Sequence, residues 1–261
     1  MGKLKDLAAV HTARAESFVY VPPAAAFVAA RILIKLDMAY PQAAPVTVSV
    51  PVLAAVMRGL RRANPLARIV LVEHAAPGSN LEAIFTQLGV VDLFDEEVRG
   101  ADIDILIMRD YANRLPQPAR HATLTAPEYV ADYDCVISVS AFKRGQQDGQ
   151  PVIAAALHNL VGLAPDLRAP VADGHVADAV TQKDLYFTLG HHVDSAVVDL
   201  THKLVSADAR VAHGEAVPVG QVVWGDDLLA VDETACRIAG EPAPALLADL
   251  RALREQLQQA G

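Results

Sequence analysis

The chain has 261 residues, of which 52% are hydrophobic, and a formal net charge of −9 at pH 7. A chain of this length and hydropathy can bury a large core, which argues against global disorder. Nucleic-acid surfaces rely on clustered Lys and Arg, so the acidic balance predicts no nucleic-acid partner. The tightest basic group, Arg58, Arg61 and Arg62, falls on a predicted helix, where we interpret it as a solvated face.

The cysteines and the N-terminal region indicate a reduced, non-membrane protein. Cys135 and Cys236 fall in a predicted strand and a predicted helix without metal-type spacing, so we expect both to be reduced core residues. The N-terminus lacks an apolar signal core, and Pro22 and Pro23 interrupt the apolar stretch 18–34. We therefore expect a cytoplasmic protein with no membrane partner.

Strands and helices alternate along the chain. Strands are predicted at 17–21, 31–34, 68–74, 103–108, 135–139, 195–199 and 221–224, where β-branched and apolar residues dominate. Helices are predicted at 51–62, 81–88, 151–163, 232–239 and 245–259, and the proline-rich stretch 109–128 is a predicted surface excursion. This order predicts one α/β domain over residues 1–261, with a mainly parallel or mixed central sheet, helices on both faces and Rossmann-like layering.

The segment 241–261 contains the last predicted helix, which is amphipathic. Leu246, Leu250, Leu253 and Leu257 form one stripe along it. We interpret this stripe as packing on the same domain rather than as a device for binding a partner.

Two lysines end predicted strands. Lys35 follows the apolar run that begins at Arg31, and Lys143 follows the run that begins at Asp134. An unpaired ammonium in a sheet would cost several kcal/mol, so each lysine should reach solvent, a carboxylate or an anionic ligand. Ligands of open α/β sheets bind beyond the carboxyl ends of strands, so a strand-end cleft is predicted. Other polar residues at strand exits are Asp37, Glu73, His74, Asp199, Asp226 and Asp227.

The stretch 173–202 is rich in histidine and aspartate. His175, His191, His192 and His202 offer imidazole groups that suit Zn or Fe. Their spacing matches no known ligand signature, so solvated or capping histidines are the simpler interpretation. A metal-dependent or metal-handling protein using Zn or Fe is the alternative hypothesis.

Several segments together resemble the domain-of-unknown-function family 362, over about residues 30–240. Ile34-Lys35 matches a family strand ending in Ile-Lys, and Lys143 matches the second lysine of a Pro-Lys-x-Lys-x-His segment. The stretch 157–162 matches Leu-Lys-Asn-x-x-Gly, with His158 in place of the lysine, and 225–232 matches Gly-Asp-x-x-Ala-x-Asp. The chain departs from the family pattern at Ser140, Ala141 and Gly145, which replace the proline, the first lysine and the histidine.

The resemblance implies an α/β fold and, in many relatives, an association with ferredoxin-type iron–sulfur domains. Because the chain has only two cysteines, we expect it to hold no iron–sulfur cluster. Any electron-transfer role would need a separate redox partner protein.

The leading hypothesis is an enzyme, or an enzyme-like protein, that acts on a small anionic molecule, a carboxylate or a phosphate, at the strand-end cleft. Lys35 and Lys143 would bind the anion, assisted by Asn159 and His158. Asp37 or Asp232 would act as acid or base, although Asp232 is also expected to cap the helix that it begins. A non-catalytic binding or assembly subunit whose C-terminal helix meets a partner, including a second copy in a homodimer, is the third hypothesis.

Overall fold

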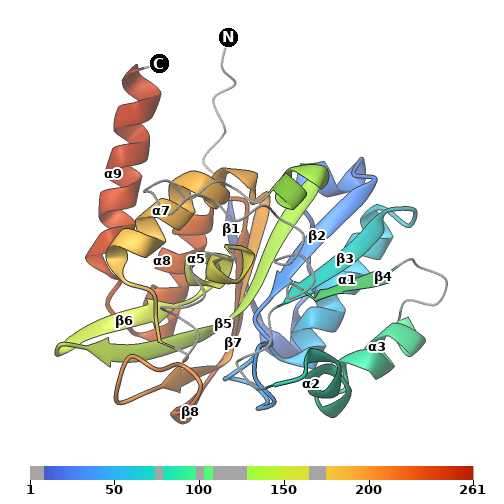
Figure 1. The fold of residues 1–261 in the computed structure, drawn as a ribbon, viewed down its shortest axis with the longest axis horizontal. Coiled ribbons are helices and arrows are strands. Elements are labelled where there is room, and N and C mark those ends of the chain that lie inside the picture. The colour runs from blue at the N-terminus through green and yellow to red at the C-terminus, as the bar shows by residue number, and fades with distance from the viewer. Residues whose placement is uncertain (1–8, 74–78, 98–102, 108–127, 165–174, 261) are drawn as a thin grey trace.

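The computed structural model describes residues 9–73, 79–97, 103–107, 128–164 and 175–260. The described strands form one sheet in the order β1-β8-β7-β5-β2-β3-β4, with β6 paired to β5 (Figure 1). Their bounds are β1 Val10–Arg14, β2 Arg31–Leu36, β3 Arg68–Glu73, β4 Ile103–Ile107, β5 Cys135–Gln147, β6 Gln150–Ala154, β7 Ser195–Val205 and β8 Glu215–Gly225. The α-helices are α1 Val50–Ala63, α2 Leu81–Gln87, α3 Val90–Glu97, α5 Ala156–Asn159, α7 Ala179–Leu189, α8 Leu228–Ala239 and α9 Ala245–Ala260.

The centre of the sheet is parallel and its margins are antiparallel. Strand β2 runs parallel to β3 and β5, β3 to β4, and β5 to β7. Strands β1, β6 and β8 join in antiparallel pairs. The prediction of an α/β fold with a mixed sheet is therefore confirmed. This topology brings the carboxyl ends of β2 and β3 together at one edge, where β5 continues past them from Val139 to Gln147.

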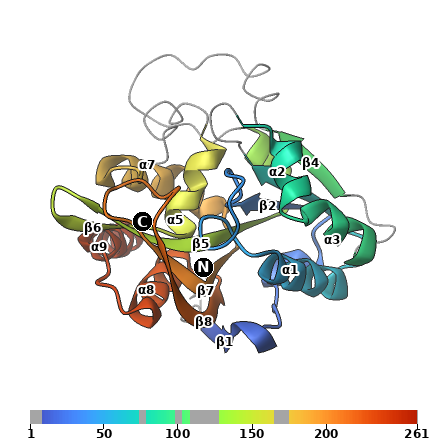
Figure 2. The same ribbon diagram turned by 90° about the horizontal axis from the view of Figure 1, so that it is seen from below.

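Helices cover both faces of the sheet. Ile32 and Ile34 belong to a buried cluster that contains residues of α1, whereas Leu33 belongs to a second cluster with residues of α5 and α8. Successive side chains of a strand point to opposite faces of the sheet, so β2 packs against apolar residues on both faces. Figure 2 shows α1 and α5 on opposite sides of the central strands.

The two cysteines are core residues, as predicted. Cys135 lies in the first buried cluster and Cys236 in the second, and both carry free thiols. Burial raises the pKa of both thiols, that of Cys135 to about 12. Each thiol therefore stays protonated at neutral pH.

The predicted strand 17–21 is wrong. A 3-10 turn, Ala15–Ser17, precedes extended residues that join no ladder within the described part of the chain. Phe18 and Tyr20 are buried while their neighbours Val19 and Val21 are exposed, which explains the strand-like pattern. The backbone of Tyr20 lies so close to α1 that a Cβ on Gly59 would come within 2.7 Å of the Tyr20 carbonyl oxygen.

The predicted helix 151–163 is wrong in its first third. Residues 150–154 instead form β6, which pairs with the part of β5 beyond the predicted strand end at Val139. Lys143 therefore lies inside β5 and does not end the strand as predicted, because the β5–β6 hairpin extends the strand to Gln147. Asp148 and Gly149 form the turn with φ of 51° and 75°, a two-residue hairpin that favours Asp-Gly. Only α5 and the following 3-10 turn, Leu160–Leu163, are helical.

The predicted start of the helix at Asp232 is also wrong. Helix α8 begins at Leu228, and the Asp227 side chain caps it by accepting a hydrogen bond from the Ala230 N–H at 3.0 Å. Asp232 lies inside the helix and is buried. The predicted C-terminal helix is confirmed as α9, with Leu250 buried against its own domain. Within the described ranges, no helix combines the length and hydropathy that a bilayer crossing requires.

Candidate functional site

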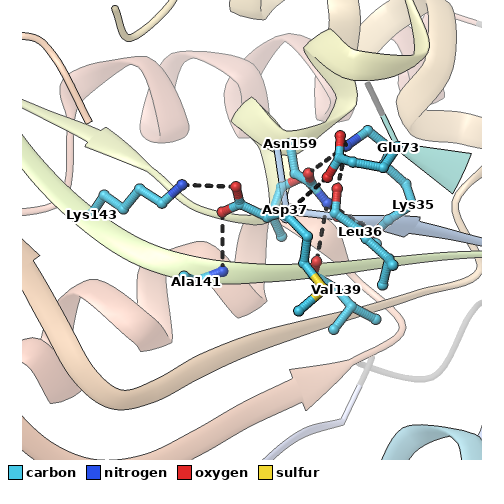
Figure 3. Close-up of polar contacts among 11 residues, drawn as sticks. Lys35, Leu36, Asp37, Glu73, Val139, Ala141, Lys143 and Asn159 are labelled. Carbon is cyan, nitrogen blue, oxygen red and sulfur yellow. Dashed lines mark hydrogen bonds and ion pairs between the residues drawn. The ribbon is translucent and has the colours of Figure 1, made fainter. Parts of the chain in front are cut away.

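Polar side chains gather at the carboxyl ends of β2 and β3, beside the middle part of β5 (Figure 3). We call this group the strand-end cluster; its members are Lys35, Asp37, Glu73, Lys143, His158 and Asn159. Both lysines are nearly inaccessible, with exposed fractions of 2% for Lys35 and 3% for Lys143. Such burial of two ammonium groups requires carboxylates or other acceptors close by.

Lys35 is neutralised inside the protein. Its Nζ lies 2.9 Å from Glu73 Oε1 and 3.0 Å from Asn159 Oδ1, and it also donates to the Leu36 carbonyl. Glu73 accepts a second hydrogen bond from the Met38 N–H through its other oxygen. The parallel register of β2 and β3 aligns Lys35 with Val72, which brings the next residue of β3, Glu73, within reach.

Asn159 links three elements around this ion pair. Its Nδ2 donates to the Lys35 carbonyl at 3.1 Å and to Ser138 Oγ at 3.0 Å. Ser138 in turn donates to the Ala156 carbonyl at 3.1 Å. The buried amide is thus well satisfied, and it holds Lys35 on β2 against α5. The motif that contains Asn159 therefore has a structural role beside the lysine.

Gly162 leaves space for the same lysine. A Cβ at this position would lie 2.2 Å from Lys35 Cε and 2.7 Å from its Nζ. Lys35 cannot swing aside easily, because Glu73 and Asn159 both hold its ammonium group. The glycine of the Leu-Lys-Asn-x-x-Gly pattern is therefore explained by close approach.

Gly162→Ala is expected to lower the free energy of unfolding by about 1–3 kcal/mol, because it overpacks a buried site that cannot relax. Urea unfolding of this variant measures the loss. Gly149→Ala is a poor comparison because Gly149 has a positive φ. Ala164→Gly, two residues after Gly162, instead shows the ordinary cost of a small change nearby. A Gly162→Ala protein as stable as the wild type would contradict the close approach.

Lys143 and Asp37 form the more open half of the cluster. Lys143 Nζ lies 2.7 Å from Asp37 Oδ1, and the Ala141 N–H donates to Asp37 Oδ2 at 3.2 Å. The Asp37 side chain is 18% exposed, compared with 4% for Lys143 and 3% for both Lys35 and Glu73. Asp37 is therefore the most solvent-accessible of the four charged groups in the two ion pairs.

His158 adds a neutral imidazole next to this pair. Burial, reinforced by the positive charge of Lys143, lowers the pKa of His158 to about 4. Its Nε2 is buried without a hydrogen-bond partner among the described residues. The ring is therefore uncharged at neutral pH, and because it donates its one N–H to the His175 backbone, the free Nε2 is a hydrogen-bond acceptor.

Asp232 is placed to hold α5 rather than to contact the lysines. Its two carboxyl oxygens accept hydrogen bonds from the N–H groups of Ala156 and Leu157, each at 2.9 Å. Asp232 therefore caps α5, not the helix on which it lies. Burial raises its pKa to about 7, while the two N–H bonds act in the opposite direction. Its position fixes the first turn of the helix that carries His158 and Asn159.

The structure gives no support to a metal centre at the predicted histidines. The rings of His191 and His192 lie side by side with centroids 4.0 Å apart, while His175 forms an isolated bridge with Arg210 and His202 lies on β7. Among the residues that the structure describes, no three His, Cys, Asp or Glu side chains are grouped to hold a metal ion. Asp173, part of the same stretch, lies outside the described residues.

Three residues of this arrangement were not predicted as site residues from the sequence. Glu73 was noted at a strand exit but was given no role, and Ser138 and Gly162 were not singled out. The available signal was the pairing of neighbouring strand ends, which places a carboxylate beside a strand-end lysine when two strands are adjacent and parallel.

The chain was compared with family models, curated proteins and solved structures. The family model described as a domain of unknown function, DUF362, matches residues 32–237, a range that contains every residue of the strand-end cluster and Asp232. No curated protein and no solved structure matches the chain. Because the family model covers well over half of its length, the chain belongs to the DUF362 family.

Proposed function

We propose that the protein is an enzyme acting on a small carboxylate or phosphate, which binds at the Asp37–Lys143 side of the strand-end cluster. The observation that carries the proposal is the unequal exposure of the two ion pairs. Lys35 and Glu73 are closed off, whereas Asp37 is partly open beside a buried lysine and a neutral histidine.

The chemistry of this half suits an anion and a proton transfer. An incoming carboxylate or phosphate would take the place of Asp37 on the Lys143 ammonium and keep its charge neutralised. The released Asp37 carboxylate could then accept a proton from the ligand, and His158 could accept a hydrogen bond from the ligand through Nε2. Lys35, bound by Glu73 and Asn159, would supply a fixed positive charge behind the site rather than a direct contact.

A binding experiment tests this proposal. Wild-type protein is expected to bind inorganic phosphate or malonate, measured by the rise of Tm with ligand concentration and by calorimetry. Lys143→Met should weaken that binding by about ten- to a hundredfold, because a charge-assisted contact contributes roughly 1.5–3 kcal/mol.

Lys203→Met is the matched control, because Lys203 is a paired lysine on β7 that bonds the Ala239 carbonyl and Glu241. This variant should bind both ligands like the wild type. The proposed site would be refuted if both variants lost binding equally. It would also be refuted if the wild-type protein bound neither phosphate nor malonate nor related small anions.

A further inference from the structure

A groove runs between α7 and α9, separate from the strand-end cluster in its lining residues. Its volume is about 440 Å³, and its walls include Val180 and Lys183 from α7 and Leu246, Asp249 and Leu253 from α9. Both helices contribute apolar side chains to it. It therefore offers a surface on which an apolar helix face can pack.

The apolar stripe of α9 continues beyond the part that its own domain covers. Leu250 is fully buried, whereas Leu257, two turns further along, is 62% exposed. Val180, on the opposite wall of the groove, is 71% exposed. Figure 1 shows the C-terminal part of α9 extending past the body of the domain. Leu253 of the same stripe lines the groove, and Leu257 follows it by one helical turn just beyond the groove's lining.

The charges on this surface are self-complementary. The arginines of α9 are engaged within the chain, Arg251 with Glu233 and Arg254 with Asp227. In contrast, Lys183 and Asp249 both line the groove and are exposed, and neither forms an ion pair with the described residues. A two-fold axis beside the groove would set the lysine of one copy against the aspartate of the other, twice.

We infer that the protein forms a two-fold homodimer in which α9 of each copy lies in the α7–α9 groove of the other. The pairing covers Val180 and Leu257 and joins Lys183 of each copy to Asp249 of the second. Four helices would then pack together, as in a small bundle. This inference does not depend on the proposed small-molecule activity.

Charge exchange tests the pairing. Lys183→Glu alone and Asp249→Lys alone should each weaken the dimer at least about tenfold, because the two-fold axis applies every like-charge contact twice. An equimolar mixture of the two variants should associate again, since both contacts between unlike copies are then attractive. Sedimentation-velocity ultracentrifugation over a range of protein concentrations measures the Kd, with circular dichroism as a check of folding.

Replacement of exposed apolar residues by glutamate is the second test of the dimer. Val180→Glu and Leu257→Glu should each yield a monomer, whereas Leu66→Glu should dimerise like the wild type, because Leu66 is 93% exposed but lies outside this groove. Wild-type protein that stays monomeric at every concentration would overturn the inference. So would dimers that survive all four groove variants, or a mixture of the charge variants that fails to associate.

Discussion

Lys35→Met is expected to lower the free energy of unfolding by about 3–5 kcal/mol, because it leaves the Glu73 carboxylate buried without its cation. Both side chains of this pair are 3% exposed, so solvent cannot replace the lost partner. The substitution also removes a donor from Asn159 Oδ1, which lies 3.0 Å from the Lys35 Nζ. Urea or thermal unfolding of the variant, with and without phosphate, measures the loss.

Two further variants isolate the cause of that loss. Glu73→Gln combined with Lys35→Met should recover part of the stability, because no buried charge is then left unpaired. Lys203→Met, which alters a lysine of a more open ion pair, should cost less. If Lys35→Met were as stable as the wild type without ligand, Lys35 would not be a structural ion-pair partner, and a direct role in anion binding would regain support.

The charge state of Asp232 is expected to give the protein a distinctive pH dependence. The folded-state pKa of this carboxyl is raised from 3.8 to about 7, chiefly by burial. A carboxyl with a raised folded pKa contributes stability that is fully present below about pH 4 and is lost as the pH rises through about 7. At about 1.4 kcal/mol for each pKa unit, the contribution is on the order of 4 kcal/mol.

The lowered pKa of His158 changes the free energy of unfolding in the opposite direction over part of the same pH range. Its folded-state pKa is lowered from 6.5 to about 4, so its contribution is present above about pH 6.5 and is lost as the pH falls towards 4. The wild-type curve therefore contains two opposing contributions. Comparison of variants is needed to separate them.

Asp232→Asn separates the Asp232 contribution. The variant cannot ionise, so between pH 4 and 8 its free energy of unfolding should lack the decline that the Asp232 carboxyl adds to the wild-type curve. It should also be less stable at pH 5, because an amide offers one acceptor oxygen to the two N–H groups of Ala156 and Leu157. Denaturant unfolding at closely spaced pH values measures both effects.

Asp178→Asn is the matched control, because Asp178 caps α7 from an exposed position by accepting a hydrogen bond from the Thr181 N–H at 2.7 Å. Its curve should keep the shape of the wild type. Parallel curves for Asp232→Asn and the wild type would show that Asp232 does not titrate in this range.

Most of the secondary-structure order and the place of Lys35 near the end of β2 could be predicted from the sequence alone, whereas Lys143 lies inside β5 rather than at its end. The apolar runs before Lys35 and Lys143 have strand character, and α1 and α9 follow from helical spacing. These features are local, because periodicity within a dozen residues decides which face of an element is apolar. The hairpin at Asp148 and Gly149 was not predicted, although Asp-Gly is a local hairpin signal, because the apolar residues after it were assigned to a helix.

The groups that contact the lysines and Asp232 could not be predicted from the sequence, because these contacts depend on the tertiary structure. Glu73 reaches Lys35 because β3 lies beside β2 in parallel register, and Asn159 reaches it because α5 packs over the same strand end. Asp232 caps α5 because α8 lies against that short helix, 76 residues further along the chain. Strand order, register and helix docking depend on the packing of the whole core, and no local pattern encodes such distant partners.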